Sequence, residues 1–135
     1  MSLRFFIDEN LSTGLRLPLA HTFSQHRFET AERLQLRAVD DEDLVADVAA
    51  RGYDAVITGD LHQMERPSER DALRESGMQW IGVPVPPGDG ASVIAEQLAM
   101  VVRGVTVVLA SWPPAPTAFW LALPGSTLDQ KPTPI

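Results

Sequence analysis

The 135-residue chain has no cysteine and only one lysine, Lys131, close to its C-terminus. Without cysteine the protein can form neither a disulfide bond nor a thiolate zinc site, which agrees with the reducing cytoplasm where we expect it to act. Its first apolar run, Phe5–Ile7, is far too short for a secretory signal peptide. No stretch approaches the roughly 20 apolar residues of a membrane span, so we expect no membrane partner.

The scarcity of lysine and of glycine-rich motifs argues against several common α/β classes. Response-regulator receiver domains normally need a lysine after a late strand, haloacid-dehalogenase-type phosphatases also use one, and Lys131 is poorly placed for either. The chain has neither Gly-x-Gly-x-x-Gly nor Gly-x-x-x-x-Gly-Lys, so the usual dinucleotide and P-loop sites are not expected. It also lacks the nucleophile elbow of serine hydrolases.

Positive charge is scarce as well, since the formal net charge is -7. General nucleic-acid binders usually present a basic face, so this balance argues against indiscriminate binding. Acids gathered around a metal site would nevertheless raise the negative count, and bound cations would offset it. A hydrophobic content of 44% and this chain length fit one domain with a real core.

Short apolar runs alternate with amphipathic segments along the chain. We expect strands at Leu3–Ile7, His21–Ser24, Ala55–Thr58, Gln79–Val83 and Val105–Ser111. We expect helices from Asn10 or Ser12 to about Pro18, then at Phe28–Leu34, from Asp40 or Asp41 to Gly52, and at Ser68–Ser76 and Ala91–Val102. This alternation predicts a three-layer α/β/α domain whose central sheet is mostly parallel and has about five strands.

The C-terminal part departs from this alternation. We expect the domain to cover residues 1–112, and residues 113–135 to form a proline-rich apolar extension that is partly disordered from Ser126 onward. The extension contains apolar side chains that would be costly to leave in water, at Phe119, Trp120, Leu121 and Leu123. They could cover the domain's own sheet, join a homodimer or receive a partner protein.

Acids stand where two predicted strands end. Asp8 follows the first apolar run and Asp60 follows the third, so both carboxylates should reach the same edge of a parallel sheet. A third group of acids, Asp40–Asp43, heads a predicted helix. Clustered carboxylates suit Mg²⁺ and the hydrolysis of a phosphodiester. Each acid alone could instead be a helix cap or a turn residue.

The segment Asp8-Glu9-Asn10-Leu11-Ser12 resembles the opening of the PIN-like family of small ribonucleases, in a branch of short proteins. Asp41-Glu42-Asp43-Leu44 resembles that family's acid-headed helix, and Val56–Asp60 resembles the strand that brings in the third acid. The similarity covers residues 3–100. It implies RNA cleavage with Mg²⁺ or Mn²⁺, with Asp8, Asp41 and Asp60 as the metal-binding and catalytic acids. Many such proteins are toxins paired with an antitoxin protein.

One position departs from the family pattern. His62 stands two places after Asp60, where the family commonly has a further acid. Histidine suits Mn²⁺ better than Mg²⁺ and can bind phosphate or carry a proton, but it can equally mark a weakened metal site. Asn10, Thr58 and Glu42 could support the site, or they could simply cap a helix or pack within a strand.

Three arginines follow the third acid. Arg66, Arg70 and Arg74 have the i, i+4, i+8 spacing of one helix face. They could contact RNA phosphates, or they could pair with the acids between residues 69 and 75. The sequence thus predicts a metal-dependent ribonuclease, with a toxin of a toxin–antitoxin pair as the expected role. The alternative is a PIN-like interaction module that has lost efficient cleavage.

Overall fold

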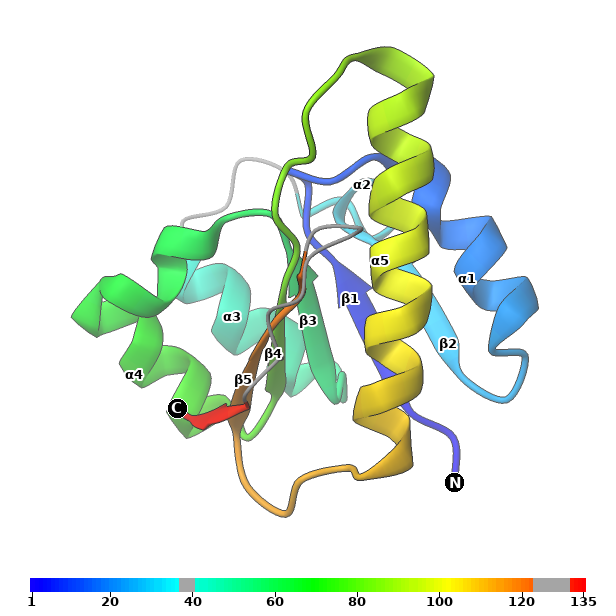
Figure 1. Ribbon diagram of the computed structural model, residues 1–135. Helices are drawn as coiled ribbons and strands as arrows, with labels where there is room; N and C mark the ends of the chain where they lie inside the picture. Colours follow the sequence, from blue (N-terminus) through cyan, green and yellow to red (C-terminus); the bar gives the residue numbers. More distant parts are fainter. Residues whose placement is uncertain (37–40, 123–131) are drawn as a thin grey trace.

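The structure is a computed structural model that describes residues 1–36, 41–122 and 132–135, with the backbone alone at 41 and 42. Its centre is a six-stranded sheet in the order β2-β1-β3-β4-β5-β6 (Figure 1). The strands are β1 Arg4–Ile7, β2 Arg27–Thr30, β3 Ala55–Thr58, β4 Gln79–Gly82, β5 Thr117–Trp120 and β6 Thr133–Pro134. The first five are parallel, and β6 runs antiparallel to β5.

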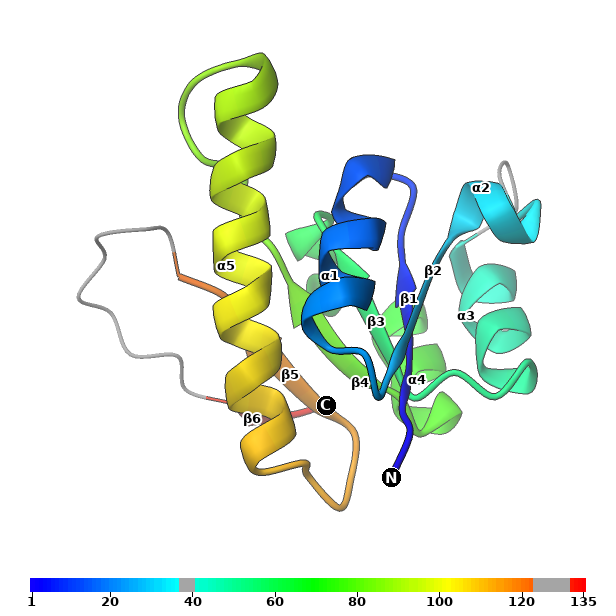
Figure 2. The same ribbon diagram turned by 90° about the vertical axis from the view of Figure 1, so that its right-hand side faces the viewer.

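Helices cover both faces of the sheet. Helices α1 (Arg16–Thr22) and α5 (Gly90–Ala110) lie on one face, and α3 (Asp41–Ala50) and α4 (Pro67–Ser76) lie on the other (Figures 1 and 2). The short elements are α2 (Ala31–Leu34) and two 3₁₀ turns, η1 (Thr13–Leu15) and η2 (Leu61–Glu65). The predicted three-layer α/β/α domain with a mostly parallel sheet is therefore confirmed.

Two apolar clusters hold the layers together. Side chains of β1 alternate between them, because successive residues of a strand point to opposite faces. Phe5 and Ile7 pack with α1 and α5, and Phe6 packs with α3 and α4. Every residue of β3 and β4 is buried, as central strands of a covered parallel sheet should be.

The second strand and the helix before it differ from the prediction. Helix α1 continues through Pro18 to Thr22, so the strand expected at His21–Ser24 is wrong and β2 lies further along the chain. Pro18 is tolerated because it lies in the first turn of α1, where backbone N–H groups lack helical partners. Of the helix expected at Phe28–Leu34, only the last four residues are helical.

The prediction also failed around α5. Instead of the strand expected at Val105–Ser111, residues 105–110 form the end of one 21-residue helix, and Ser111 caps it. The β-branched residues of this segment favour a strand by local preference. However, Val101, Val105 and Val108 repeat at helical spacing and are buried against the sheet. Such packing outweighs a weak local preference of a few tenths of a kcal/mol per residue. The fifth parallel strand is β5, at Thr117–Trp120, where the sequence analysis predicted no strand.

Residues of the predicted C-terminal extension join the sheet. Strand β5 pairs with β4, and Phe119 and Leu121 are buried in the apolar cluster beneath α5. Gly104 of α5 permits this contact, since a Cβ at that position would lie 2.4 Å from a methyl group of Leu121. Packing on the same chain is therefore the outcome for these side chains. The predictions for residues 123 and 126–131 lie outside the described residues.

Helix α5 bears on the membrane prediction. In the part of the chain that the structure describes, this one helix is long and apolar enough to span a bilayer, with a mean hydropathy of 1.8 and a third of its window buried. The expectation that no stretch has such length and composition is therefore wrong for α5. Length and composition alone do not place a helix in a membrane, because the core helix of a soluble domain passes the same test. The absence of a membrane partner stays a prediction.

Candidate functional site

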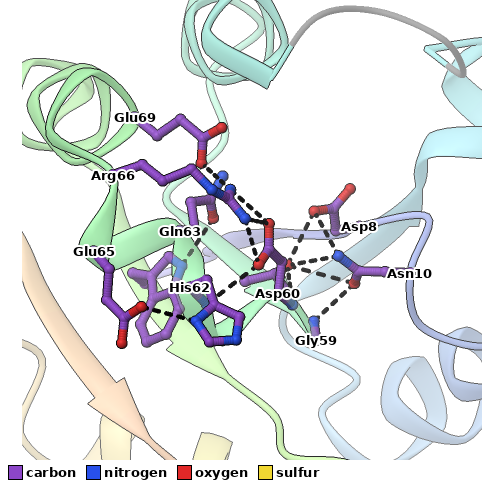
Figure 3. Close-up of polar contacts among 11 residues, drawn as sticks. Asp8, Asn10, Gly59, Asp60, His62, Gln63, Glu65, Arg66 and Glu69 are labelled. Carbon is purple, nitrogen blue, oxygen red and sulfur yellow. Dashed lines mark hydrogen bonds and ion pairs between the residues drawn. The ribbon is translucent and has the colours of Figure 1, made fainter.

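The sheet brings two carboxylates to adjacent strand ends. Asp8 follows β1 directly, and Asp60 lies two residues beyond β3. These strands are neighbours, and the pairing extends past β1 because Asp8 N donates to the carbonyl oxygen of Ile57 at 2.9 Å. Both acids therefore lie at the carboxyl edge of the sheet, as the sequence predicted for them (Figure 3).

Asp8 is held by several hydrogen bonds in a largely buried position. The residue is 9% exposed. Its Oδ1 accepts from the backbone N–H of Glu9 at 2.8 Å, and its Oδ2 accepts from the hydroxyl of Thr58 at 3.0 Å and the amide of Asn10 at 3.4 Å. These donors fix the direction of the carboxylate before any ligand arrives.

Asn10 and Thr58 join the two strand ends to each other. The Asn10 Oδ1 accepts from the backbone N–H of Gly59 at 2.7 Å, and its Nδ2 donates to the Thr58 hydroxyl at 3.1 Å. The same hydroxyl accepts from the backbone N–H of Asp60 at 3.1 Å. The structure therefore places both expected supporting residues against Asp8 and the backbone that carries Asp60.

Asp60 is paired with an arginine of its own chain. Arg66 Nη1 donates to Asp60 Oδ2 at 2.9 Å, and Nη2 lies 3.0 and 2.9 Å from the two carboxylate oxygens. Arg66 Nη1 also donates to Glu69 Oε2 at 2.5 Å. The hydrogen bonds with Asp60, and then with Glu69, raise the pKa of Arg66 above its ordinary value. The guanidinium therefore stays charged beside Asp60.

The position of Arg66 corrects the prediction of one arginine face. Arg66 is the residue before α4, whereas Arg70 and Arg74 lie inside that helix. Arg70 donates to the carbonyl oxygen of Pro134 at 3.3 Å, and Arg74 pairs with Asp71. Sequence reasoning missed the pair with Asp60, because a separation of six residues across a 3₁₀ turn has no standard pairing rule.

His62 points to a different partner. Its side chain is 77% exposed, and its Nδ1 lies 2.8 Å from Glu65 Oε2. Figure 3 shows the ring turned toward Glu65 and not toward Asp8. The residue that replaces the family's further acid thus contacts Asp60 only through its backbone N–H, which donates to Asp60 Oδ1 at 3.2 Å.

The acid-headed helix begins beside Asp8. Helix α3 starts at Asp41, and residues of its first turns, Leu44 and Val45, line a small pocket with Asp8. The side chains of Asp41 and Glu42 lie outside what the structure describes, as does Asp40. Helix α3 therefore brings its N-terminal turn to the strand ends, as predicted, without fixing which acid points toward them.

A buried pair that the sequence did not reveal supports the turn from Asp60 to Arg66. Gln63 of η2 accepts at 3.0 Å from the indole N–H of Trp80, a fully buried residue of β4. Gln63 also lines the pocket beside Asp8. This bond ties η2 to the sheet and so fixes the turn that carries Arg66 back to Asp60.

The described side chains do not fit a divalent metal as they stand. Among them no group of three or more His, Cys, Asp or Glu residues could hold one. An ionised carboxylate has about four acceptor positions, and those of Asp60 already face Arg66 and the His62 N–H. A cation at Asp60 would therefore require Arg66 to move away.

Comparison with known proteins identifies one family. A family model described as "PIN like domain" matches residues 3–83, which is more than half of the chain. The matched region contains β1 to β4, and hence both Asp8 and Asp60. No curated protein and no solved structure matches the chain.

Proposed function

Because the chain belongs to the PIN-like domain family, whose members are in general nucleases, we propose that it hydrolyses RNA phosphodiesters. The observation that supports this most is the position of Asp8 and Asp60 at neighbouring strand ends inside the matched region. Asp8 is held there by Thr58, Asn10 and the backbone of Glu9. A carboxylate fixed in this way loses little entropy when it takes up a ligand.

The proposed cofactor is Mg²⁺ or Mn²⁺, with Asp8, Asp41 and Asp60 as the residues that would hold it. When bound, such an ion would supply positive charge for the scissile phosphate. In the arrangement described above, Asp60 is already occupied by Arg66, so this part of the proposal requires the pair to open. Glu42 and His62 stay secondary candidates, and Arg70 and Arg74 stay candidates for phosphate contacts on α4.

Cleavage of single-stranded RNA tests the proposal. The native chain is incubated with a labelled RNA and Mg²⁺ or Mn²⁺, beside Asp8→Asn, Asp60→Asn and the control Asp47→Asn. Asp47 is an aspartate on the surface of α3 that pairs with Arg51, away from the strand ends. We expect Asp8→Asn and Asp60→Asn to lose at least about tenfold in rate, equivalent to about 1.4 kcal/mol, and Asp47→Asn to match the native chain. Equal rates for all four proteins would contradict the nuclease proposal.

We further propose the role of a toxin held in check by an antitoxin protein. Support comes from the Asp8–Ser12 motif, which resembles the branch that contains such toxins. Induced expression of the native chain in a bacterial host should arrest growth, and Asp8→Asn should not. A small adjacent reading frame for a DNA-binding protein would add support. Normal growth with the native chain at a verified expression level would contradict the toxin role.

A second candidate is a partner-binding module without efficient cleavage. The observation that favours it is the saturation of Asp60 by Arg66, together with His62 in place of an acid. In that case neither metal nor the Asp8→Asn substitution would change the level of RNA cleavage. The partner would be an antitoxin-like protein or a second copy, and light scattering on the purified chain would reveal a homodimer.

A further inference from the structure

We propose that Arg66 is a built-in cation that competes with a divalent metal for Asp60, and so sets the metal affinity of the site. The inference rests on the proposed function, because it concerns the same acid pair. It adds a residue that the metal-binding acids alone do not suggest. Arg66 stands on one side of Asp60, and Asp8 and Asn10 stand on the other (Figure 3).

Four hydrogen bonds reach the two carboxylate oxygens of Asp60. Its Oδ1 accepts from Arg66 Nη2 at 3.0 Å and from the His62 N–H at 3.2 Å. Its Oδ2 accepts from Arg66 Nη1 and Nη2, both at 2.9 Å. A carboxylate offers about four acceptor positions, so a metal ion can bind Asp60 only where an Arg66 N–H withdraws.

Charge adds to this steric competition. A guanidinium in contact with a carboxylate lowers that carboxylate's affinity for a second cation by about tenfold or more, because the two cations repel each other. A divalent ion at the same oxygens is opposed in the same direction, since two cations would lie within contact of one carboxylate. Removal of the Arg66 charge should therefore raise metal affinity about tenfold or more.

Glu69 is a second carboxylate partner for Arg66. Glu69 belongs to the first turn of α4 and is only 8% exposed, and its Oε2 is bonded to Arg66 Nη1. When Arg66 leaves Asp60 it keeps this carboxylate partner, so the exchange does not leave the guanidinium unpaired. The pair can therefore open without the penalty of an isolated charge, and Arg66 remains next to the strand ends after a metal enters.

The test measures Mn²⁺ binding directly, without RNA. Native chain, Arg66→Gln and Arg66→Lys are titrated with Mn²⁺ and free ion is followed by electron paramagnetic resonance. Arg51→Gln is the matched control, because it removes an arginine that directly follows α3 and pairs with a surface carboxylate of that helix, Asp47. Arg66→Gln/Asp8→Asn shows whether any gained binding uses the strand-end site.

We expect Arg66→Gln to bind Mn²⁺ about tenfold or more tightly than the native chain, and Arg51→Gln to bind as the native chain does. Arg66→Lys keeps the charge but loses the planar guanidinium that bonds both oxygens of Asp60. Its Mn²⁺ affinity should therefore lie between that of the native chain and that of Arg66→Gln. The gain should disappear in the double variant. Arg66 is 42% exposed, so these substitutions should leave the fold intact.

The outcomes separate this inference from the proposed nuclease. If the native chain cleaves RNA but Arg66→Gln and Arg66→Lys bind Mn²⁺ no more tightly than it does, the inference is wrong and the nuclease stands. If Arg66→Gln gains Mn²⁺ binding through Asp8 but native cleavage is unaffected by Asp8→Asn, the inference stands and the nuclease proposal fails. Absence of Mn²⁺ binding in every variant would overturn the inference outright.

Discussion

Replacement of Thr58 by valine removes one buried hydroxyl and keeps the shape of the side chain. Thr58 has no exposed surface, and its hydroxyl contacts three groups, which are the Asp8 carboxylate, the Asn10 side chain and the backbone N–H of Asp60. It donates to Asp8 Oδ2 at 3.0 Å and accepts from the amide of Asn10 and the backbone N–H of Asp60, both at 3.1 Å. A valine leaves all three groups without this partner at a position that is itself fully buried.

The loss of stability that we expect for Thr58→Val follows from these contacts. A hydrogen bond to a charged group contributes about 1.5–3 kcal/mol and a neutral one about 0.5–1.5 kcal/mol. The added methyl group of valine returns up to about 0.8 kcal/mol, and neighbours in one network do not add fully. We therefore expect Thr58→Val to lower the free energy of unfolding by about 2–3 kcal/mol, and the melting temperature by roughly 10 °C.

Urea denaturation of Thr58→Val and Thr58→Ser provides the measurement. Serine keeps the hydroxyl and loses one buried methyl group, which costs about 1 kcal/mol. The network account predicts that valine is the more damaging change, although it is the better strand former. It would be refuted if Thr58→Ser cost as much as Thr58→Val, or if Thr58→Val lay within about 0.5 kcal/mol of the native chain.

Three further stability predictions use the same urea assay. Gly82→Ala should cost about 1–3 kcal/mol, because a Cβ there would lie 2.3 Å from the fully buried ring of Trp80. Gln79→Leu should cost about 2 kcal/mol, because its amide donates to two loop carbonyls after α5 and accepts from the Thr117 N–H. Arg74→Ala should stay within about 0.5 kcal/mol, because its pair with Asp71 is half exposed.

The central strands could be predicted because burial on both faces leaves a plain sequence signal. Strands β1 and β3 are apolar runs bounded by polar residues, and an acid follows each strand within two residues. Strand β2 gave no such signal, since Arg27–Thr30 alternates exposed and buried residues at the sheet's edge. Strand β5 was missed because it lies among prolines, and its burial depends on α5 packing above it.

The site was predictable only in part for a related reason. The position of Asp8 and Asp60 follows from strand pairing, which the apolar runs encode. The partner of Asp60 depends instead on the path of η2, which is fixed by a buried bond between Gln63 and Trp80. Contacts formed across an irregular turn depend on tertiary packing, and residue spacing carries little of that information.

The residue that most affects the proposed metal site is therefore Arg66, whereas the sequence pointed to His62. The histidine at position 62 suggested a damaged metal site, yet its ring is mostly exposed and contacts Glu65. Arg66 has the greater influence, because it occupies both oxygens of Asp60 and carries a charge that no accessible pH removes. Under the competition that we propose, uptake of a divalent ion at this edge of the sheet depends on how readily Arg66 gives up Asp60 while it keeps Glu69.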